Sequence, residues 1–175
     1  MAARSGSARS SKPRKGSTPP LSALDLGIDL GTTRTVVARA DRGNYPVLSF
    51  TDTNGDSHDY YPSLTALTDD GLVHGFRARR AARQGAPLLR SLKRTLAAPS
   101  VSAASPVALG DRTLGVGEVL VSFLTDLRQE LAASGVLDGA DPGGEDANVV
   151  VAVPAHAYGA QRLLTLDAFR AAGFH

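Results

Sequence analysis

The sequence predicts an α/β fold in which a mixed β-sheet is flanked by helices, and three features carry this prediction. Residues 24–30 alternate apolar and polar side chains, which is the period of a half-buried strand. Residues 116–131 repeat apolar side chains at the spacing of an amphipathic helix. Residues 149–153 are apolar on both faces, as in a central strand, and a helical segment follows at 157–172. Strands that alternate with helices are typical of α/β proteins.

The chain opens with a tail and a predicted hairpin. Residues 1–22 are rich in Ser, Arg, Lys, Gly and Pro, so we expect a disordered basic tail, because this composition buries too little apolar surface to offset the entropy of folding. After the strand at 24–30, a tight turn at 31–33 leads to a returning strand at 35–40, which predicts a β-hairpin. A third strand is expected near 47–50.

The middle of the chain is predicted to hold a polar loop, a second hairpin and two short helices. The loop covers 51–59, and the hairpin joins 63–67 to 72–76 through an Asp-Asp-Gly turn. The first helix is expected at 78–84. The second, at 87–96, would begin with proline, whose fixed φ and missing N–H are tolerated in the first turn of a helix.

The last third contains the strongest helical pattern. Residues 99–110 are predicted to be a connector with one short strand, and Gly135 is expected to end the long helix in the left-handed conformation. Residues 138–146 contain three Gly and one Pro and predict a loop. Gly173 is placed to end the final helix in the same way as Gly135.

Composition excludes several classes of protein. The chain has no Cys, which excludes disulfides and thiolate sites and agrees with a cytoplasmic location. No apolar run approaches the roughly 18 residues of a membrane span, so no membrane partner is expected, and the first 20 residues lack the apolar core of a secretory signal. Their acid-free, Arg- and Ser-rich composition leaves an organellar transit peptide as an alternative.

The net charge of +2 is dominated by the tail. Five of the 19 basic residues lie in the first 15 positions, which leaves 14 basic against 17 acidic residues in the rest of the chain. The body is therefore not a basic nucleic-acid binder, and nucleic acid is not an expected partner. The four histidines show no metal-ligand spacing.

The turn after the first strand has the composition of a phosphate-binding loop. Asp29 ends the strand and is followed by Gly31, Thr32 and Thr33. Glycine lets backbone N–H groups approach an anion closely, threonine hydroxyls add donors, and a carboxylate beside phosphates can hold Mg²⁺ through water. The alternative is an ordinary hairpin whose polar turn happens to contain these residues.

This turn resembles the first phosphate loop of the superfamily that contains actin, sugar kinases and heat-shock chaperones. Two later segments, at 153–155 (Val-Pro-Ala) and 160–162 (Ala-Gln-Arg), resemble the strand-end proline and helix-borne arginine of the DnaK-type, heat shock protein 70 chaperone family. Pro62-Ser63 and the segment 91–94 (Ser-Leu-Lys-Arg) occur in the family's order and approximate spacing. The resemblance covers residues from about 24 to 174.

The resemblance implies an incomplete actin-like ATPase (ribonuclease H-like) lobe. Its first subdomain would comprise 23–50 and 147–175, and 51–146 would be an inserted second subdomain. In the family the second phosphate loop, the adenosine pocket and the peptide-binding domain come after the last residue of this chain. We therefore expect ATP or ADP with Mg²⁺, and K⁺ as a further candidate ion, to bind fully only with the missing lobe, and we expect an unpaired sheet edge. Unfolded polypeptide clients and co-chaperones would be partners of the parent protein.

The resemblance also implies roles for particular residues. Lys93 matches the lysine that points at the terminal phosphate and orders the attacking water, and Asp29 would support the metal. The phosphates would be gripped by the turn residues Gly31, Thr32, Thr33 and Arg34. Pro154 and Arg162 would belong to the switch that relays the nucleotide state.

Three departures from the family pattern affect these roles: Arg34, His156 and Gly159 replace residues that are usually Asn, Tyr and Asp. We expect Gly159 to weaken the final helix by about 1 kcal/mol. Lys93 also lies in an acid-free basic stretch that could be a solvated face or a weak nucleic-acid surface.

Two other functions stay open at this point. The chain could be a fragment of a sugar-kinase-like enzyme of the same superfamily. It could also be a non-catalytic interaction module that uses the basic tail or the open sheet edge.

Overall fold

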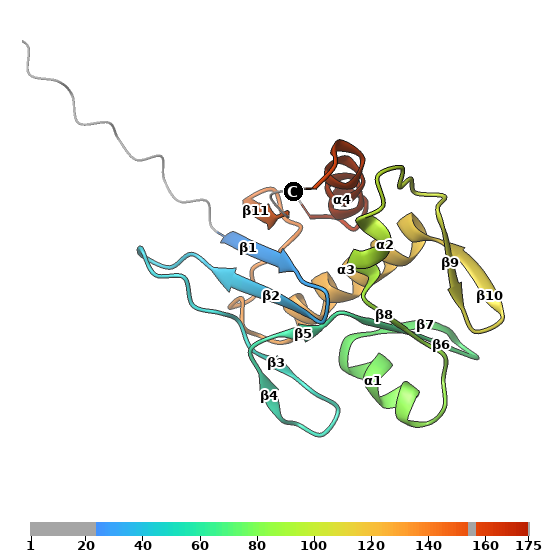
Figure 1. The fold of residues 1–175 in the computed structure, drawn as a ribbon. Coiled ribbons are helices and arrows are strands. Elements are labelled where there is room, and N and C mark those ends of the chain that lie inside the picture. The colour runs from blue at the N-terminus through green and yellow to red at the C-terminus, as the bar shows by residue number, and fades with distance from the viewer. Residues whose placement is uncertain (1–23, 154–156, 175) are drawn as a thin grey trace, which may run out of the picture.

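The computed structural model describes residues 24–153 and 157–174. A four-stranded mixed sheet is built around the first strand of the chain (Figure 1). In this sheet β1 (Leu24–Leu30) runs parallel to β11 (Ala147–Ala152) on one side and antiparallel to β2 (Arg34–Arg39) on the other. The short β5 (Tyr61–Pro62) completes the order β11-β1-β2-β5. The sheet and its helices confirm the predicted mixed α/β fold and the opening hairpin.

A second, three-stranded sheet is formed from the middle of the chain, in the order β7-β6-β8. The helix α1 (Gly75–Arg83) packs against β6 and follows β7 directly. Two small hairpins lie outside this sheet. The strands of the second sheet and of the hairpins are β6 (Leu64–Thr68), β7 (Gly71–His74), β8 (Leu88–Arg90), β3 (Phe50–Thr51), β4 (Ser57–His58), β9 (Pro106–Leu109) and β10 (Arg112–Gly115).

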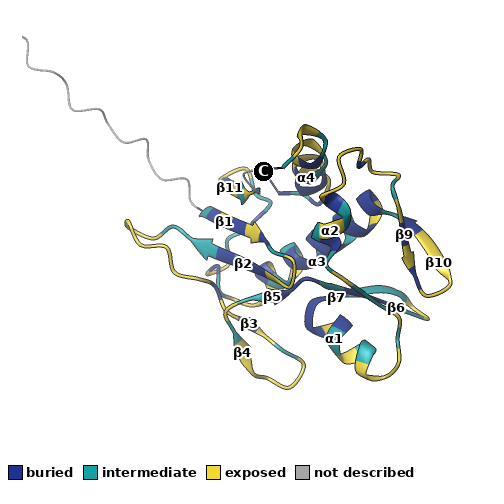
Figure 2. Ribbon diagram, in the orientation of Figure 1, coloured by how far each residue is buried: buried dark blue, intermediate teal, exposed yellow. Residues whose placement is uncertain are grey.

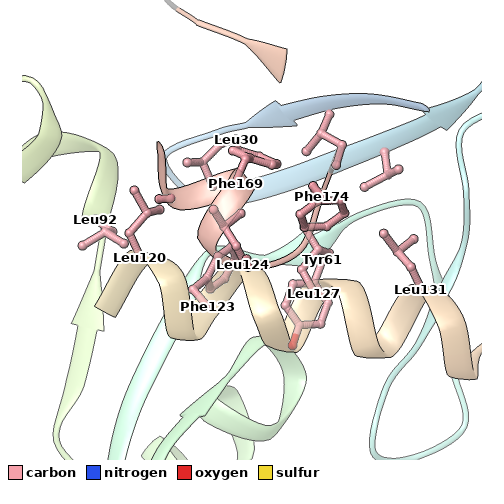
Figure 3. Close-up of a cluster of buried hydrophobic side chains, with 14 of the residues drawn as sticks. Leu30, Tyr61, Leu92, Leu120, Phe123, Leu124, Leu127, Leu131, Phe169 and Phe174 are labelled. Atoms are coloured by element: carbon pink, nitrogen blue, oxygen red, sulfur yellow. The ribbon is translucent and has the colours of Figure 1, made fainter. Parts of the chain in front are cut away.

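The helix α3 (Val116–Ala133) is the centre of the core (Figure 2). It contacts α2 (Leu92–Leu96), α4 (Gly159–Ala171), β7 and β10. Its apolar stripe, which includes Leu120, Leu124 and Leu127, is fully buried and faces side chains from several elements (Figure 3). Because burying one such side chain stabilises a fold by about 1.5–3 kcal/mol, this stripe holds the elements together. The predicted helix at 116–131 is confirmed.

The expected polar loop at 51–59 is wrong in one respect, since its two ends pair as the β3–β4 hairpin. The Asp52 carboxylate organises this hairpin by accepting hydrogen bonds from the backbone N–H groups of Asn54 (2.8 Å) and Asp56 (3.1 Å). The third strand expected near 47–50 is reduced to an isolated bridge between Ala38 and Val47 before β3 begins.

The predicted helix at 87–96 is wrong in its first part and confirmed in its second part, α2. Its first part is β8, which pairs antiparallel with β6, and the Pro87 carbonyl accepts a hydrogen bond from the Leu67 N–H at 3.0 Å. Ser91 then adopts the left-handed conformation (φ 62°), and only the residues after it form α2. Pairing with a neighbouring strand has overridden the local preference of proline for a helix start.

The strand β11 is not central, although its sequence is apolar throughout. Within the described residues it pairs only with β1, which agrees with the expected unpaired edge. Val150 is 65% exposed, and alternate residues of the strand point away from the core. An apolar run shows that both faces tolerate burial, but it does not show which face is covered.

Several other sequence predictions are confirmed, and others fall on residues that the structure does not describe. The helix α1 begins three residues before its predicted start, and the hairpin of β6 and β7 is confirmed. Gly135 (φ 72°) and Gly173 (φ 83°) adopt the predicted left-handed conformation. The tail at 1–22 lies outside the described residues, and the division into subdomains stays a prediction. No helix in the described ranges is long and apolar enough to cross a membrane.

Candidate phosphate-binding site

The turn between β1 and β2 presents unpaired backbone donors. The Gly31 N–H donates to the Asp29 carbonyl oxygen at 3.0 Å, and a Cβ at Gly31 would collide with the carbonyl oxygen of Arg34. Glycine is therefore required for the chain to turn this tightly. Thr32 and Thr33 are exposed, and in the described part of the chain their backbone N–H groups have no acceptor. Two amides and two hydroxyls are thus available to an anion.

The turn is held in place from the opposite side. The Thr35 and Ser63 hydroxyls form a buried hydrogen bond at 3.0 Å, and the Ser63 N–H donates to the Thr33 carbonyl oxygen at 3.1 Å. These bonds tie the start of β2 to the segment between β5 and β6. The donors of the turn are consequently presented on a supported backbone.

Lys93 lies beside this turn. The left-handed Ser91 redirects the chain from β8 into α2, and Lys93 lies in the first turn of that helix. Its Nζ atom is 3.8 Å from the Asp29 carboxylate, and 23% of the Lys93 side chain is exposed against 62% for Asp29. The structure therefore brings Lys93, Asp29 and the turn together.

A hollow of about 320 Å³ lies between the turn and α4, and both Thr32 and Lys93 line it. Arg94, Tyr158 and Gln161 complete the polar part of its wall. We call this hollow the lysine pocket. Gln161 is 4% exposed and comes from the first turn of α4. Sequence reasoning did not assign Gln161 or Arg94 to the site, although each adjoins a residue that it did assign, Arg162 and Lys93.

Thr33 and Arg34 face a different pocket. The Arg34 guanidinium lies 4.4 Å from the centre of the Tyr60 ring, and both Thr33 and Arg34 line a hollow with Tyr60. The predicted phosphate-gripping residues are therefore divided. Thr32 shares the lysine pocket, whereas Thr33 and Arg34 belong to its neighbour.

Of the two predicted switch residues, Arg162 lies among the described residues and Pro154 does not. Pro154 lies outside the described residues, as does His156. Arg162 is an exposed residue of α4 and does not line the lysine pocket. Gly159 is the first residue of α4, not an interior one, so the expected helix-weakening effect of this glycine is wrong, because the first position of a helix lacks an intrahelical N–H bond in any case.

The residues of the site fit a magnesium ion held through water better than a direct metal centre. Among the described residues, no group of three or more His, Asp or Glu side chains could hold a metal ion. A lone exposed carboxylate beside free amides matches the way in which Mg²⁺ is bound with phosphates, since this ion keeps most of its water. Asp29 is the residue that could support it.

A buried polar network supports the fold on the far side of β5. The Tyr61 hydroxyl donates to one oxygen of Asp126, and the Arg77 guanidinium donates to the other. Burial and the neighbouring carboxylate raise the pKa of Tyr61 well above its usual range. Gly75 packs against the Tyr61 ring so closely that a Cβ would collide with it. Sequence reasoning missed this network, because its members are spread over β5, α1 and α3.

His74 is a second buried polar group in this region. Its Nδ1 is 2.9 Å from the Thr65 hydroxyl and its Nε2 is 2.8 Å from the Ser122 hydroxyl. Burial lowers the pKa of His74 to about 4, an effect that the Asp126 charge partly opposes. The imidazole is therefore held neutral, which is a structural role and not that of a metal ligand.

The sequence of the chain is similar to Hsp70-type chaperones. Over 94% of its length it is 31% identical to the chaperone protein HscA of Pectobacterium carotovorum subsp. carotovorum (strain PC1) and to the chaperone protein HscA homolog of Laribacter hongkongensis (strain HLHK9). It is 32% identical, over the same share of the chain, to the chaperone protein HscA of Edwardsiella ictaluri (strain 93-146).

The chain spans 28% of the length of these relatives. These relatives are chaperones of the Hsp70 type, and the similarity to them does not single out DnaK. No protein-family model matches the chain.

Proposed function

We propose that the chain is the phosphate-gripping part of an actin-like ATPase lobe in an Hsp70-type chaperone. The parent protein would couple ATP hydrolysis to the binding and release of unfolded polypeptides, with co-chaperones as further partners. One observation carries the proposal. Lys93, from α2, lies beside Asp29 and Thr32 at the β1–β2 turn, where the backbone amides of the turn are free.

Each residue would have a distinct task. The N–H groups and hydroxyls of Thr32 and Thr33 would donate hydrogen bonds to the β- and γ-phosphates, with Gly31 allowing the close approach. Lys93 would hold the terminal phosphate and orient the attacking water. Charge-assisted donors of this kind are the main source of catalysis in phosphoryl transfer, because the reaction needs positioning and charge stabilisation more than covalent chemistry.

Bound Mg²⁺ would supply further neutralisation of the phosphate charge. Asp29 would hold the ion through water, and the Asp29–Lys93 distance of 3.8 Å is loose enough for both groups to turn to a ligand. The lysine would then compensate the negative charge that remains on the phosphates.

We expect Mg-ATP to bind weakly to this chain alone. The turn, Lys93 and Gln161 provide contacts for the phosphates, and the base and ribose would depend on parts of the parent protein beyond this chain. Isothermal titration should accordingly show no low-micromolar isotherm. A tight isotherm would contradict the view that the described residues hold only the phosphates.

Nitrogen-15 NMR titration with Mg-ATP tests the location of binding. The amide signals of Gly31, Thr32 and Thr33 should shift progressively and together at millimolar ligand. The shifts should be lost in Lys93→Ala and kept in Arg112→Ala, which removes an exposed cation from β10. Shifts that avoid the turn, or that depend equally on both cations, would overturn the proposal.

A further inference from the structure

The pocket beside the turn is rich in arginine. It has a volume of about 430 Å³ and is lined by Arg34, Arg79, Arg83 and Arg90, together with Thr33 and Tyr60. We call it the arginine pocket. Its volume lies in the range of pockets that hold small ligands. No Asp or Glu contributes to its wall.

Two of the four guanidinium groups are positioned by one aromatic ring. Arg34 lies over Tyr60 with its Cζ 4.4 Å from the ring centre, and the Cζ of Arg79 is 5.9 Å from the same centre. Arg79 Nη2 also donates to the Tyr60 hydroxyl at 3.2 Å. The ring thus holds two cations close together, although like charges repel at this separation.

The positive charge of the pocket is not compensated by the described residues. Among the described residues, none of the four arginines forms an ion pair. Six other Lys and Arg side chains do, namely Arg39, Arg42, Arg77, Lys93, Arg128 and Arg170 with Asp138, Asp41, Asp126, Asp29, Asp141 and Asp167. Arg34, Arg83 and Arg90 are exposed, so an anion can reach them from solvent. A planar guanidinium offers paired N–H donors that match the oxygens of a phosphate.

The arginine pocket is separate from the lysine pocket. The backbone turn divides them, since Thr32 lines one hollow and Thr33 lines the other, and they share no residue. Arg79 and Arg83 come from α1, which contributes nothing to the lysine pocket. Substitutions in α1 can therefore alter the arginine pocket without removing a side chain that lines the lysine pocket.

We infer that the arginine pocket is a second anion site, which binds a compact polyphosphate group. Four cations around one hollow exceed the charge of a single phosphate, and their arrangement around a shared ring favours several linked phosphates. The ligand could be the phosphate tail of a nucleotide or inorganic polyphosphate. This inference does not depend on catalysis at Lys93.

The test is isothermal titration of the full 175-residue chain with inorganic tripolyphosphate, at fixed ionic strength. Arg79→Ala and Arg83→Ala should each weaken binding by about tenfold, the usual effect of losing a charge-assisted hydrogen bond. The matched control is Arg80→Ala, because Arg80 is exposed on the same helix and does not line the pocket. This control should change the affinity by less than about twofold, since a surface charge acts only weakly.

Two further variants protect the interpretation. Arg79→Lys/Arg83→Lys keeps the charge and should bind with intermediate affinity, because lysine lacks the planar fork. Arg112→Ala, which removes an exposed cation of β10 that lines neither pocket, should bind tripolyphosphate as tightly as the wild type, and thermal melting should show that each variant is folded. Arg79→Ala should keep the Mg-ATP shifts of the Gly31 and Thr32 amides, which Lys93→Ala loses, so failure of this inference can be told apart from failure of the proposed function.

Parallel titrations identify the source of the ligand. If metal-free ATP binds and its affinity depends on Arg79 and Arg83, the ligand is the phosphate tail of a nucleotide. If tripolyphosphate binds and ATP does not, the ligand is inorganic polyphosphate. Equal losses in Arg79→Ala and Arg80→Ala would overturn the inference, because they would show only diffuse attraction. Tighter binding of a single-stranded oligonucleotide with no dependence on Arg79 would overturn it as well.

Discussion

Two aspartates of this protein sit in opposite surroundings. Asp126, on α3, is 8% exposed and both of its carboxylate oxygens accept hydrogen bonds, one from Tyr61 and one from Arg77. Asp29, at the end of β1, has 62% of its side chain exposed and only a loose contact with Lys93 at 3.8 Å. Each carboxylate lies beside a cation, yet only one of them is saturated by its partners.

Because their surroundings differ, the two aspartates should serve different purposes: Asp126 should contribute to stability and Asp29 to ligand binding. A buried charge must be fully paired, because removing one partner leaves the other without water or protein to compensate it. An exposed charge with spare capacity costs little to keep and can turn toward a ligand. We therefore expect substitutions around Asp126 to change the free energy of unfolding, and substitutions around Asp29 to change ligand binding.

The largest expected effect is at the buried carboxylate. Asp126→Ala should lower the free energy of unfolding by about 4 kcal/mol, since it leaves the Tyr61 hydroxyl buried without an acceptor and Arg77 without its counter-charge. Urea denaturation followed by circular dichroism measures this change. A loss below about 1 kcal/mol is typical of an exposed ion pair and would contradict the proposed contrast between Asp126 and Asp29.

Acid should destabilise the protein through His74, the second buried polar group of the same region. The folded-state pKa of His74 is about 4, below its ordinary value of 6.5, so the unfolded chain binds an extra proton between these values. Stability is fully present above pH 6.5 and should fall by about 3 kcal/mol as the pH drops to 4. Denaturation at a series of pH values tests this, and His74→Phe should flatten that part of the profile. An unchanged slope in the variant would contradict the assignment.

A smaller effect is expected at the start of α4, which carries Gln161 to the lysine pocket. Gly159→Asp should raise the free energy of unfolding by about 0.5 kcal/mol, because a carboxylate in the first turn interacts favourably with the helix dipole and open space surrounds the position. The shift in the urea midpoint gives the size of the change, with Gly159→Ala as the uncharged control. A lower free energy of unfolding in Gly159→Asp would contradict the placement of this residue in the first turn of α4.

The smallest effect should come from the exposed carboxylate. Asp29→Ala should change the free energy of unfolding by less than about 0.5 kcal/mol, because its contact with Lys93 is exposed and long. The same variant should weaken the response of the turn to Mg-ATP. A stability loss close to that of Asp126→Ala would erase the distinction between the two aspartates.

Local patterns predicted some elements of the fold better than others. The alternation in β1, the turn at Gly31 and the amphipathic stripe of α3 are local signals, and each appeared in the structure where it was expected. Leu88–Arg90 became a strand because β6 offered a partner, which no local pattern reveals. The convergence of Lys93 with the turn was expected only from family resemblance.

The buried network and the arginine pocket could not be predicted in the same way. Tyr61, Arg77 and Asp126 are ordinary residues in their local segments, and only the packing of α1 against β5 and of α3 beneath them makes a network. The basic stretch around Arg79 was visible in the sequence. Its enclosure around Tyr60 depends on Arg34 from β2 and Arg79 from α1 both reaching that ring.

The most direct test of the central claim is a comparison of Mg-ATP affinity in the wild type and Lys93→Ala, measured from the amide shifts of Thr32 and Thr33. We predict at least about tenfold weaker binding in the variant, with an unchanged free energy of unfolding, because one charge-assisted contact is lost and no buried group is disturbed. Equal affinity in the two proteins would contradict the assignment of this turn and Lys93 as a phosphate-binding site.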